Sequence, residues 1–287
     1  MKIAIASGKG GTGKTTLSVN LALYMQQSQD VVLCDLDVEE PDAHVFIGGE
    51  RIAHQMVHKV VPEVNESACT ACGLCREVCA FHAITLIAGR VLVFPELCHS
   101  CHACIELCPQ QALLPRKVEL GEITEYRRDR LRFVEARLLV GQEQAVPLIR
   151  EAQRYIDQNA PASIVIYDAP PGTSCPVVQT LYDADYAILV TEPTPFGLHD
   201  LGLAAETVRL LGKPLGVVIN KDDGDDNDIV RWCESEGVPL LARIPHKRSL
   251  AGLCAGGHTL FDADPDVARA IADVSTAILS MQEGGDA

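Results

Sequence analysis

Two sets of residues in this chain have types and spacings that could do chemistry: a glycine-rich loop near the N-terminus and eight cysteines in the first half. The loop has the spacing Gly-x4-Gly-Lys-Thr between Gly8 and Thr15. Glycines let backbone N–H groups point at a phosphate, and a helix that follows adds the positive end of its dipole. We therefore expect Lys14 to bind the β- and γ-phosphates and the Thr15 hydroxyl to bind Mg²⁺. The loop residues expected to bind nucleotide are Gly8, Lys9, Gly10, Gly11, Thr12, Gly13, Lys14, Thr15 and Thr16.

The eight cysteines form two runs of the pattern Cys-x2-Cys-x2-Cys-x3-Cys, which begin at Cys69 and Cys98. Each cysteine of the second run lies 29 positions after its counterpart in the first, which indicates an internal duplication. The spacing is that of bacterial ferredoxins, in which the fourth cysteine of each run binds the other of two [4Fe–4S] clusters. The first cluster is then expected on Cys69, Cys72, Cys75 and Cys108, and the second on Cys79, Cys98, Cys101 and Cys104.

Zinc is the alternative for paired Cys-x2-Cys motifs. A zinc site needs neither the third Cys-x2 step nor the Cys-Pro ending at Pro109, so we favour two iron–sulfur clusters. His99 and His102 lie between ligands of the second cluster. They could tune its potential through charge or hydrogen bonding, or could simply be exposed.

A second lysine lies inside the phosphate loop. The pattern Lys-Gly-Gly-x-Gly-Lys-Thr, from Lys9 to Thr15, resembles that of the MinD- and ParA-type ATPases, the nitrogenase iron protein and the Mrp-type iron–sulfur carriers. The resemblance implies an ATP-dependent homodimer in which Lys9 crosses the interface and touches the nucleotide of the partner subunit. A solvated surface lysine is the alternative.

Two carboxylates, Asp35 and Asp37, follow the apolar run 31–34. In α/β sheets, ligands bind at the carboxyl ends of the strands. The resemblance makes this segment switch I and gives Asp37 the role of orienting the attacking water, with Asp35 a second candidate near Mg²⁺. Two solvated loop acids are the alternative.

A third carboxylate, Asp168, ends the apolar run 163–167 and is expected to hold Mg²⁺ through water. The resemblance makes the following Pro-Pro-Gly segment switch II, in which the Gly172 amide senses the γ-phosphate. It also implies that Asn220 binds the adenine edge, with Pro245 flanking the base. Asn220-Lys221-x-Asp fits the guanine motif of GTPases as well, so GTP is the alternative nucleotide. Cys175 is left open between a small buried apolar residue and a redox or partner-facing role.

These residues require strands that end at one edge of a sheet. Together the motifs predict an α/β fold: a three-layer, mostly parallel sheet of the P-loop NTPase type. Residues 1–60 and 116–287 are expected to form the ATPase domain in two parts, and residues 61–115 an inserted small α+β ferredoxin module of the bacterial type. Apolar runs predict strands at 2–6, 31–34, 118–120, 131–139, 163–167, 186–190, 215–219 and 238–245, and helices at 17–25, 145–156, 197–211 and 265–281.

The composition and charge limit the kinds of molecule and surface to which the chain could bind. A net charge of −15 argues against a nucleic-acid surface. The chain has twelve cysteines and begins directly in a strand without a signal peptide, so we expect a cytoplasmic protein with metal or redox chemistry. MinD-type membrane binding uses a basic amphipathic C-terminal helix; residues 281–287 lack its charge, so no stable membrane anchor is expected.

Three functions fit these features. The first, which we favour, is an ATPase whose nucleotide-driven dimerisation is coupled to electron transfer with an unidentified partner protein. The second is an iron–sulfur scaffold or carrier of the Mrp type, although the Cys-x2-Cys near the end of the ATPase domain of such carriers is missing here. The third is a MinD- or ParA-like positioning ATPase.

Overall fold

The computed structural model describes residues 1–224 and 228–284 of the chain. Of residues 281–287, on which we base the expected lack of a membrane anchor, 285–287 lie outside this range. Within the described part, no helix combines the length and the apolar character needed to cross a bilayer.

The main sheet has nine strands within the described residues, and the first seven in spatial order run parallel to one another. Only the last two, β6 and β3, are antiparallel to their neighbours. The mostly parallel α/β sheet expected from the sequence is therefore confirmed. In spatial order the strands are β11 (Leu240–Pro245), β10 (Leu215–Asp222), β9 (Tyr186–Thr191), β1 (Lys2–Ala6), β8 (Ile164–Asp168), β2 (Val31–Asp35), β7 (Leu131–Leu138), β6 (Leu113–Arg128) and β3 (Glu50–Val64).

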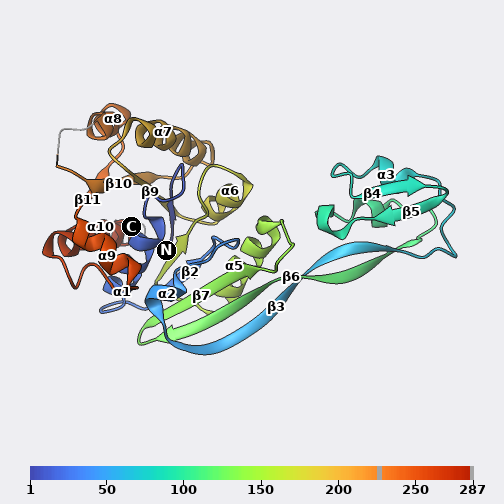
Figure 1. Cartoon of the computed structure of the whole chain (residues 1–287), viewed down its shortest axis with the longest axis horizontal. Helices are drawn as coiled ribbons and strands as arrows, with labels where there is room; N and C mark the ends of the chain where they lie inside the picture. Colours follow the sequence, from blue (N-terminus) through green and yellow to red (C-terminus); the bar gives the residue numbers. More distant parts are fainter. Residues whose placement is uncertain (225–227, 285–287) are drawn as a thin grey trace.

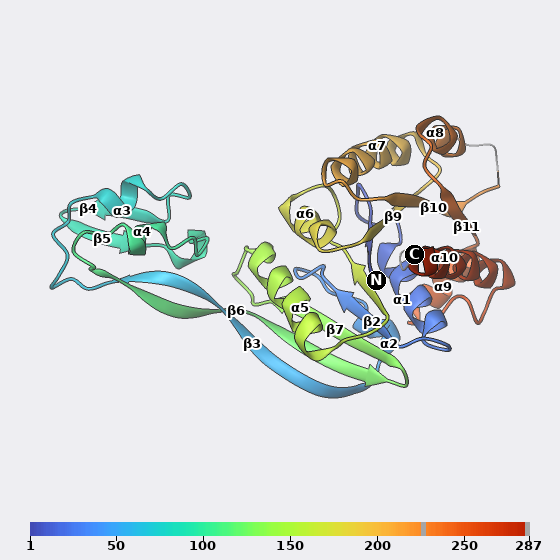
Figure 2. The ribbon, with the colours of Figure 1, turned by 180° about the vertical axis from the view of Figure 1, so that it is seen from behind.

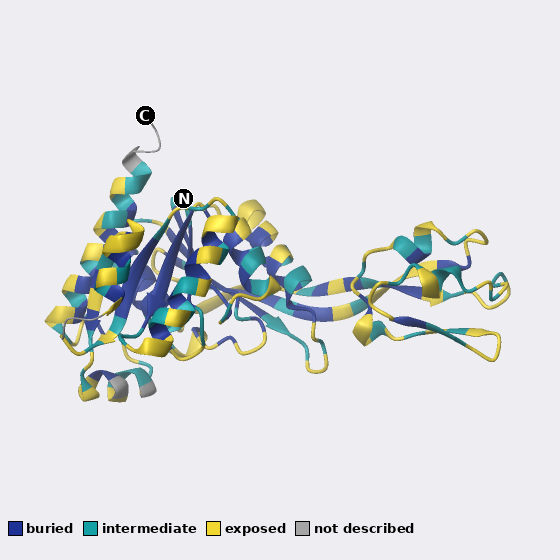
Figure 3. Cartoon of the chain, turned by 90° about the horizontal axis from the view of Figure 1, so that it is seen from above, coloured by how far each residue is buried: buried dark blue, intermediate teal, exposed yellow. Residues whose placement is uncertain are grey.

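Helices cover both faces of this sheet (Figures 1 and 2). Side chains of β1 alternate between the faces: Ile3 and Ile5 join the core under α1 (Lys14–Met25), whereas Ala4 and Ala6 join the opposite core. Both cores exclude water, as the buried strands between the helices in Figure 3 show. The first face is covered by α1, α9 (Arg248–Ala255) and α10 (Pro265–Gly284), and the second by α5 (Ala145–Asn159), α6 (Cys175–Tyr182), α7 (Pro195–Leu210) and α8 (Asp228–Glu236).

The cysteine-rich region stands away from the sheet on a two-stranded ribbon (Figure 1). Strands β3 and β6 pair from Glu50↔Arg127 to Val64↔Leu113. Their register shifts twice, between Arg51 and Ala53 and between Val57 and His58. Only residues 121–128 of β6 also pair with β7, so the remainder of the two strands projects as the ribbon. The boundaries that we place at 60/61 and 115/116 lie inside these continuous strands, and the division into domains stays a prediction.

The module at the end of the ribbon, residues 65–112, repeats its own backbone with the offset of the cysteines. Left-handed φ angles recur in three pairs that are 29 residues apart: Ala71 and Ser100, Gly73 and His102, and His82 and Gln111. The duplication read from the cysteines is therefore present in the chain path. The elements of the module are α3 (Leu74–Glu77), β4 (Ile84–Ile87), β5 (Arg90–Val93), a 3₁₀ turn (Pro95–Leu97) and α4 (Ala103–Glu106).

Candidate functional site

The glycine-rich loop lies between β1 and α1, at the carboxyl edge of the parallel strands. Gly13 precedes α1 with a φ of 93°, and a Cβ there would lie 2.2 Å from Asn220 Nδ2. The Asn220 side chain instead donates a hydrogen bond of 2.7 Å to the Thr12 carbonyl. The structure thus brings Asn220 to the loop, while its role toward a base stays a prediction. Pro245 lies at the end of β11, beside Asp222 of β10.

Lys14 begins α1 and is only 7% exposed. Its charge acts on two carboxylates, Asp37 and Asp168. Burial raises the pKa of Asp37 to about 6, and the Lys14 charge opposes this shift. The buried Lys14 ammonium is attracted by two carboxylates, and the oxygens of a bound phosphate can take their place as its anionic partners.

Asp168 ends β8 and is buried. The Ser18 hydroxyl donates a 3.0 Å hydrogen bond to Asp168 Oδ1, whereas Oδ2 is buried and has no hydrogen-bond partner within the described residues. Burial raises the pKa of Asp168 to about 7, against the effects of Thr15 and Lys14. An unsatisfied carboxylate oxygen next to a threonine hydroxyl fits a hydrated Mg²⁺, which prefers oxygen ligands.

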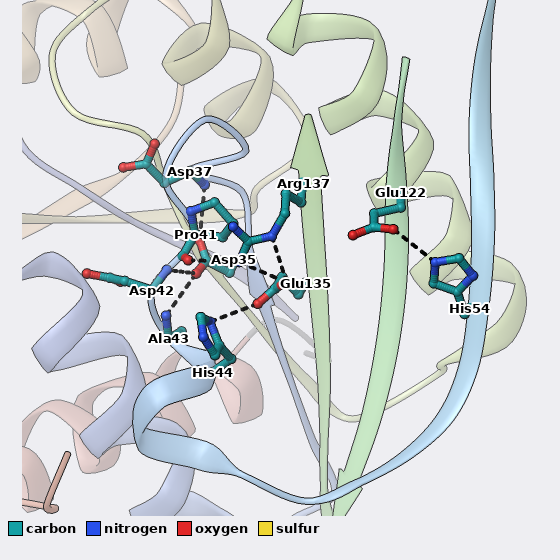
Figure 4. A network of polar contacts seen from close by, with 10 residues as sticks. All are labelled: Asp35, Asp37, Pro41, Asp42, Ala43, His44, His54, Glu122, Glu135 and Arg137. Atoms are coloured by element: carbon teal, nitrogen blue, oxygen red, sulfur yellow. Dashed lines mark hydrogen bonds and ion pairs between the residues drawn. The ribbon is translucent and has the colours of Figure 1, made fainter. Parts of the chain in front are cut away.

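The segment 35–43, which we call switch I from the resemblance, folds around Asp35 (Figure 4). The buried Asp35 carboxylate accepts hydrogen bonds from the backbone N–H groups of Asp37 (3.1 Å), Asp42 (3.0 Å) and Ala43 (3.1 Å). Asp35 therefore shapes the loop, and its role near Mg²⁺ stays a prediction. Sequence analysis did not single out Asp42, whose carboxylate lies within 4.8 Å of those of Asp35 and Asp168.

Switch I is also tied to β7 (Figure 4). Glu135 lies 3.0 Å from the His44 ring and 3.2 Å from the Arg137 guanidinium. Arg137 in turn donates a 3.4 Å hydrogen bond to the Pro41 carbonyl. On the next two strands, His54 of β3 lies 3.0 Å from Glu122 of β6. Because β7 pairs with residues 121–128 of β6, switch I is connected through β7 to the part of β6 from which the ribbon begins.

The second lysine of the loop has a partner in its own chain. Lys9 and Lys221 both form ion pairs with Glu192, which follows β9. Burial acts to raise the pKa of Glu192, but the two lysines hold it below its ordinary value. Lys9 is thus paired and partly exposed in this structure, and its role in a dimer stays a prediction.

Switch II lies against the phosphate loop. The Gly172 amide donates a 3.0 Å hydrogen bond to the Ser7 carbonyl, so sensing of a γ-phosphate by this amide stays a prediction. Cys175 begins α6 and is exposed. The alternative of a small buried apolar residue at Cys175 is therefore wrong. A cavity between the two switches is lined by residues that include Asp37, Ala145 and Ser174.

The structure brings together both predicted sets of cysteines, each around a cavity of its own. One cavity is lined by the first set and the other by the second. Equivalent backbone N–H groups point at sulfur in both halves: Ala83 lies 3.3 Å from Cys79 Sγ, and Ala112 lies 3.3 Å from Cys108 Sγ. The first cavity holds Cys69, Cys72, Cys75 and Cys108, and the second Cys79, Cys98, Cys101 and Cys104.

The spacing of the sulfurs bears on which metal these sets could hold. A zinc ion bound by cysteines at about 2.3 Å needs sulfurs roughly 3.8 Å apart. Among the described residues, only Asp35, Asp42 and Asp168 form a group of three or more metal-binding side chains whose ligand atoms lie within 4.8 Å of one another; no cysteines do. No three of the described cysteine sulfurs are therefore spaced as the ligands of a single zinc ion would be, and the metal centre that they hold stays a prediction.

Comparison with known proteins assigns the main fold. Residues 3–260 match the model of the CobQ/CobB/MinD/ParA nucleotide-binding domain. The chain belongs to this family. Membership implies nucleotide binding and the ATP hydrolysis of the P-loop ATPase superfamily.

Three relatives illustrate the likeness. An uncharacterized protein of Methanocaldococcus jannaschii is 31% identical over 77% of this chain and 80% of its own length. The iron-sulfur cluster carrier protein of Pyrococcus horikoshii is 24% identical over 85% of this chain and 73% of its own length. The MinD protein of Pyrococcus horikoshii, solved in complex with Mg-ADP, has the same fold, with a TM-score of 0.61 and 17% identity over 96% of this chain and 95% of that one.

Proposed function

We propose that this family member is an iron–sulfur ATPase that couples nucleotide binding and ATP-dependent homodimerisation to electron transfer with a partner protein. The observation that carries the proposal is the pair of cysteine-lined cavities at the end of a ribbon whose strand β6 pairs with β7, the strand that contacts switch I through Arg137. A nucleotide site and a metal module joined by continuous strands are suited to exchange conformational free energy.

At the nucleotide site, the roles follow from position and charge. Lys14 offsets the phosphate charge, and Thr15 with Asp168 would hold Mg²⁺, which neutralises charge as the γ-phosphate is transferred. Asp37 is half-buried beside Lys14, and with a pKa of about 6 it is mostly ionised at neutral pH. It can therefore accept a hydrogen bond from the attacking water. Lys9 would leave Glu192 and reach the nucleotide of the partner subunit in the dimer.

In the module, each set of four thiolates would hold one [4Fe–4S] cluster, which supplies one-electron chemistry when bound. Among the described residues, no three cysteine sulfurs lie within 4.8 Å of one another, which supports a centre larger than a single zinc ion. Cys72 and Cys101 are exposed, so a partner could approach either centre closely.

The coupling has a physical route. The ribbon strand β3 begins just after switch I, and β6 returns to β7, which holds Pro41 through Arg137. A ligand shifts an equilibrium only by its differential affinity for the two states. If ATP binds the reduced chain more tightly, it must raise a cluster potential, and a coupling of ~1.4 kcal/mol moves a one-electron potential by roughly 60 mV.

The test is anaerobic reconstitution followed by iron analysis and paired redox titrations, with and without a non-hydrolysable ATP analogue. We expect about eight irons per chain and a midpoint that moves with nucleotide. The Lys14→Ala variant, which loses the phosphate-binding charge, should keep its irons and lose the shift. Identical midpoints in all titrations would contradict the coupling.

A second candidate, an iron–sulfur carrier, is favoured by the relatives that bear this name. A carrier releases its clusters, whereas an electron-transfer protein keeps them. Mixing the reconstituted chain with an apo-ferredoxin of bacterial type, which holds [4Fe–4S] clusters, separates the two: transfer of clusters within minutes supports a carrier, and retention of all clusters supports electron transfer.

A further inference from the structure

A buried lysine lies where the ATPase core meets the cysteine-rich module. Lys59 of β3 is 3% exposed. Two residues before it on the same face of the strand, Val57 packs in the core of the ATPase domain. Two residues after it, Val61 packs with Cys98 and Cys79 of the second set. Lys59 thus places an ammonium group between two apolar clusters, where an uncompensated charge is costly.

The contacts of Lys59 do not compensate this charge. Its Nζ donates a 3.2 Å hydrogen bond to Gln144 Oε1, and the Gln144 amide nitrogen donates a 2.8 Å hydrogen bond to the Glu96 carbonyl. Within residues 1–224 and 228–284, no carboxylate lies within ion-pair distance of Lys59. Burial lowers the pKa of Lys59, and the charges of Cys98 and Glu96 act in the opposite direction. The link through Gln144 to the Glu96 carbonyl, two residues before Cys98, and the packing of Val61 against Cys98 place this charge on the side of the second cysteine set.

We infer that Lys59 is the counter-charge of the second cysteine set and raises the reduction potential of the cluster held there above that of the first. The inference rests on the proposed function. Reduction adds one electron, and so one negative charge, to a cluster that is already anionic with its four thiolates. A cation in a low-dielectric setting stabilises the reduced form more than the oxidised form. An electron given to the module by a low-potential one-electron donor would then rest on the second cluster.

The internal duplication shows that the first set has no equivalent. The position 29 residues after Lys59 is Ala88, an exposed residue in the turn between β4 and β5. Arg90 shares a cavity with Cys69 of the first set, but it is exposed and its charge is screened by water and salt. The two halves of the module therefore differ in buried charge, although their ligands match.

The test compares variants of the full, reconstituted chain by voltammetry and by EPR during redox titration. Lys59→Met removes the charge and keeps the apolar stem. It should lower one of two midpoints by at least a tenfold shift in the reduction equilibrium, about 59 mV for one electron, and leave the other unchanged. Lys59→Arg should keep both midpoints near those of the parent. Lys117→Met, which removes an exposed charge from the neighbouring strand, is the matched control and should move neither.

The assignment of the shifted midpoint uses the ligands. In a Cys101→Ser background, which impairs the second centre, Lys59→Met should have no effect on the remaining midpoint. Unchanged midpoints in Lys59→Met, or equal shifts of both, would overturn the inference while eight bound irons leave the two-cluster proposal intact. Fewer than eight irons in the parent chain would overturn both.

Discussion

The Lys9 ammonium lies 3.1 Å from the Glu192 carboxylate of the same chain. If Lys9 serves the partner's nucleotide, dimerisation must first break this pair. We expect Glu192→Gln to form the ATP-dependent dimer at a lower ATP concentration, by a few-fold, because a partly exposed pair is worth about 1 kcal/mol or less. Lys9→Ala should bind ATP but neither dimerise nor turn over. Size-exclusion chromatography with light scattering measures the first, and phosphate release the second; full turnover by Lys9→Ala would contradict the role in the dimer.

Asp37 should be needed for hydrolysis and not for binding. Its carboxylate is the group placed to orient water, so Asp37→Ala should bind ATP, dimerise and stall, with turnover reduced by about 10² or more. Equilibrium binding of a fluorescent ATP analogue and phosphate release separate the two effects. Tighter binding of GTP than of ATP in the parent chain would instead count against the adenine role of Asn220.

The buried carboxylates of the nucleotide site give the ligand-free protein a pH dependence. Burial raises the pKa of Asp168 to about 7 and that of Asp37 to about 6. Because an unfolded aspartate titrates near 4, the unfolded chain loses these protons first as the pH rises. The free energy of unfolding should therefore fall from about pH 4 to about pH 7.

The Asp168→Asn variant should flatten this fall in urea melts taken across that range, and saturating Mg²⁺ with nucleotide should flatten it in the parent chain. Asp129→Asn, at the exposed turn between β6 and β7, is the control and should leave the slope as it is. A slope that Asp168→Asn does not change would show that other groups cause it.

Asp35 should stabilise switch I rather than take part in chemistry. Removal of its carboxylate in Asp35→Ala leaves three backbone N–H groups without their acceptor, at a cost of roughly 3 kcal/mol. Hydrogen exchange at 37–43 should rise and the unfolding midpoint should fall. Asp42→Ala keeps its backbone amide and should change stability by less than about 0.5 kcal/mol while weakening Mg²⁺ binding. Equal losses of stability in the two variants would argue against this division of roles.

The crossed cysteine sets make a pairwise prediction. Cys79 belongs to the first run but lines the cavity of the second set, and Cys108 does the reverse. Cys79→Ser should therefore leave the same residual EPR signal as Cys101→Ser, and Cys108→Ser the same as Cys72→Ser. Each variant should keep about half of the iron. Signals grouped by run instead of by cavity would contradict the crossing.

Much of the ATPase fold could be predicted because its strands are short and buried on both faces. Runs such as 163–167 and 186–190 are almost wholly apolar. The structure shifts the first by one residue, to Ile164–Asp168, and extends the second by one, to Thr191. The phosphate loop was equally clear, since glycine, lysine and threonine are each required by its chemistry. The strand β3 was not predicted: residues 50–59 mix charged and polar residues with few apolar ones, because most of their side chains are exposed.

The residues that sequence reasoning missed share one property: their partners are distant in the chain. Glu192 meets Lys9, and Gln144 meets Lys59, only after the sheet has formed. Nothing in the neighbourhood of Glu192 sets it apart from other acids that follow strands. The cysteine sets were an exception, because their spacing matches the bacterial ferredoxin pattern, in which the fourth cysteine of each run joins the other set.

The paired register of β3 and β6 limits how the two ends of the molecule can communicate. A slip of one residue would turn every side chain of a strand to the opposite face, and the irregularities after Arg51 and Val57 pin the register further. The two strands therefore cannot slide along one another. Movement that begins at switch I can reach the cysteines only as a twist or a bend of the whole ribbon, so the module must reorient as one body.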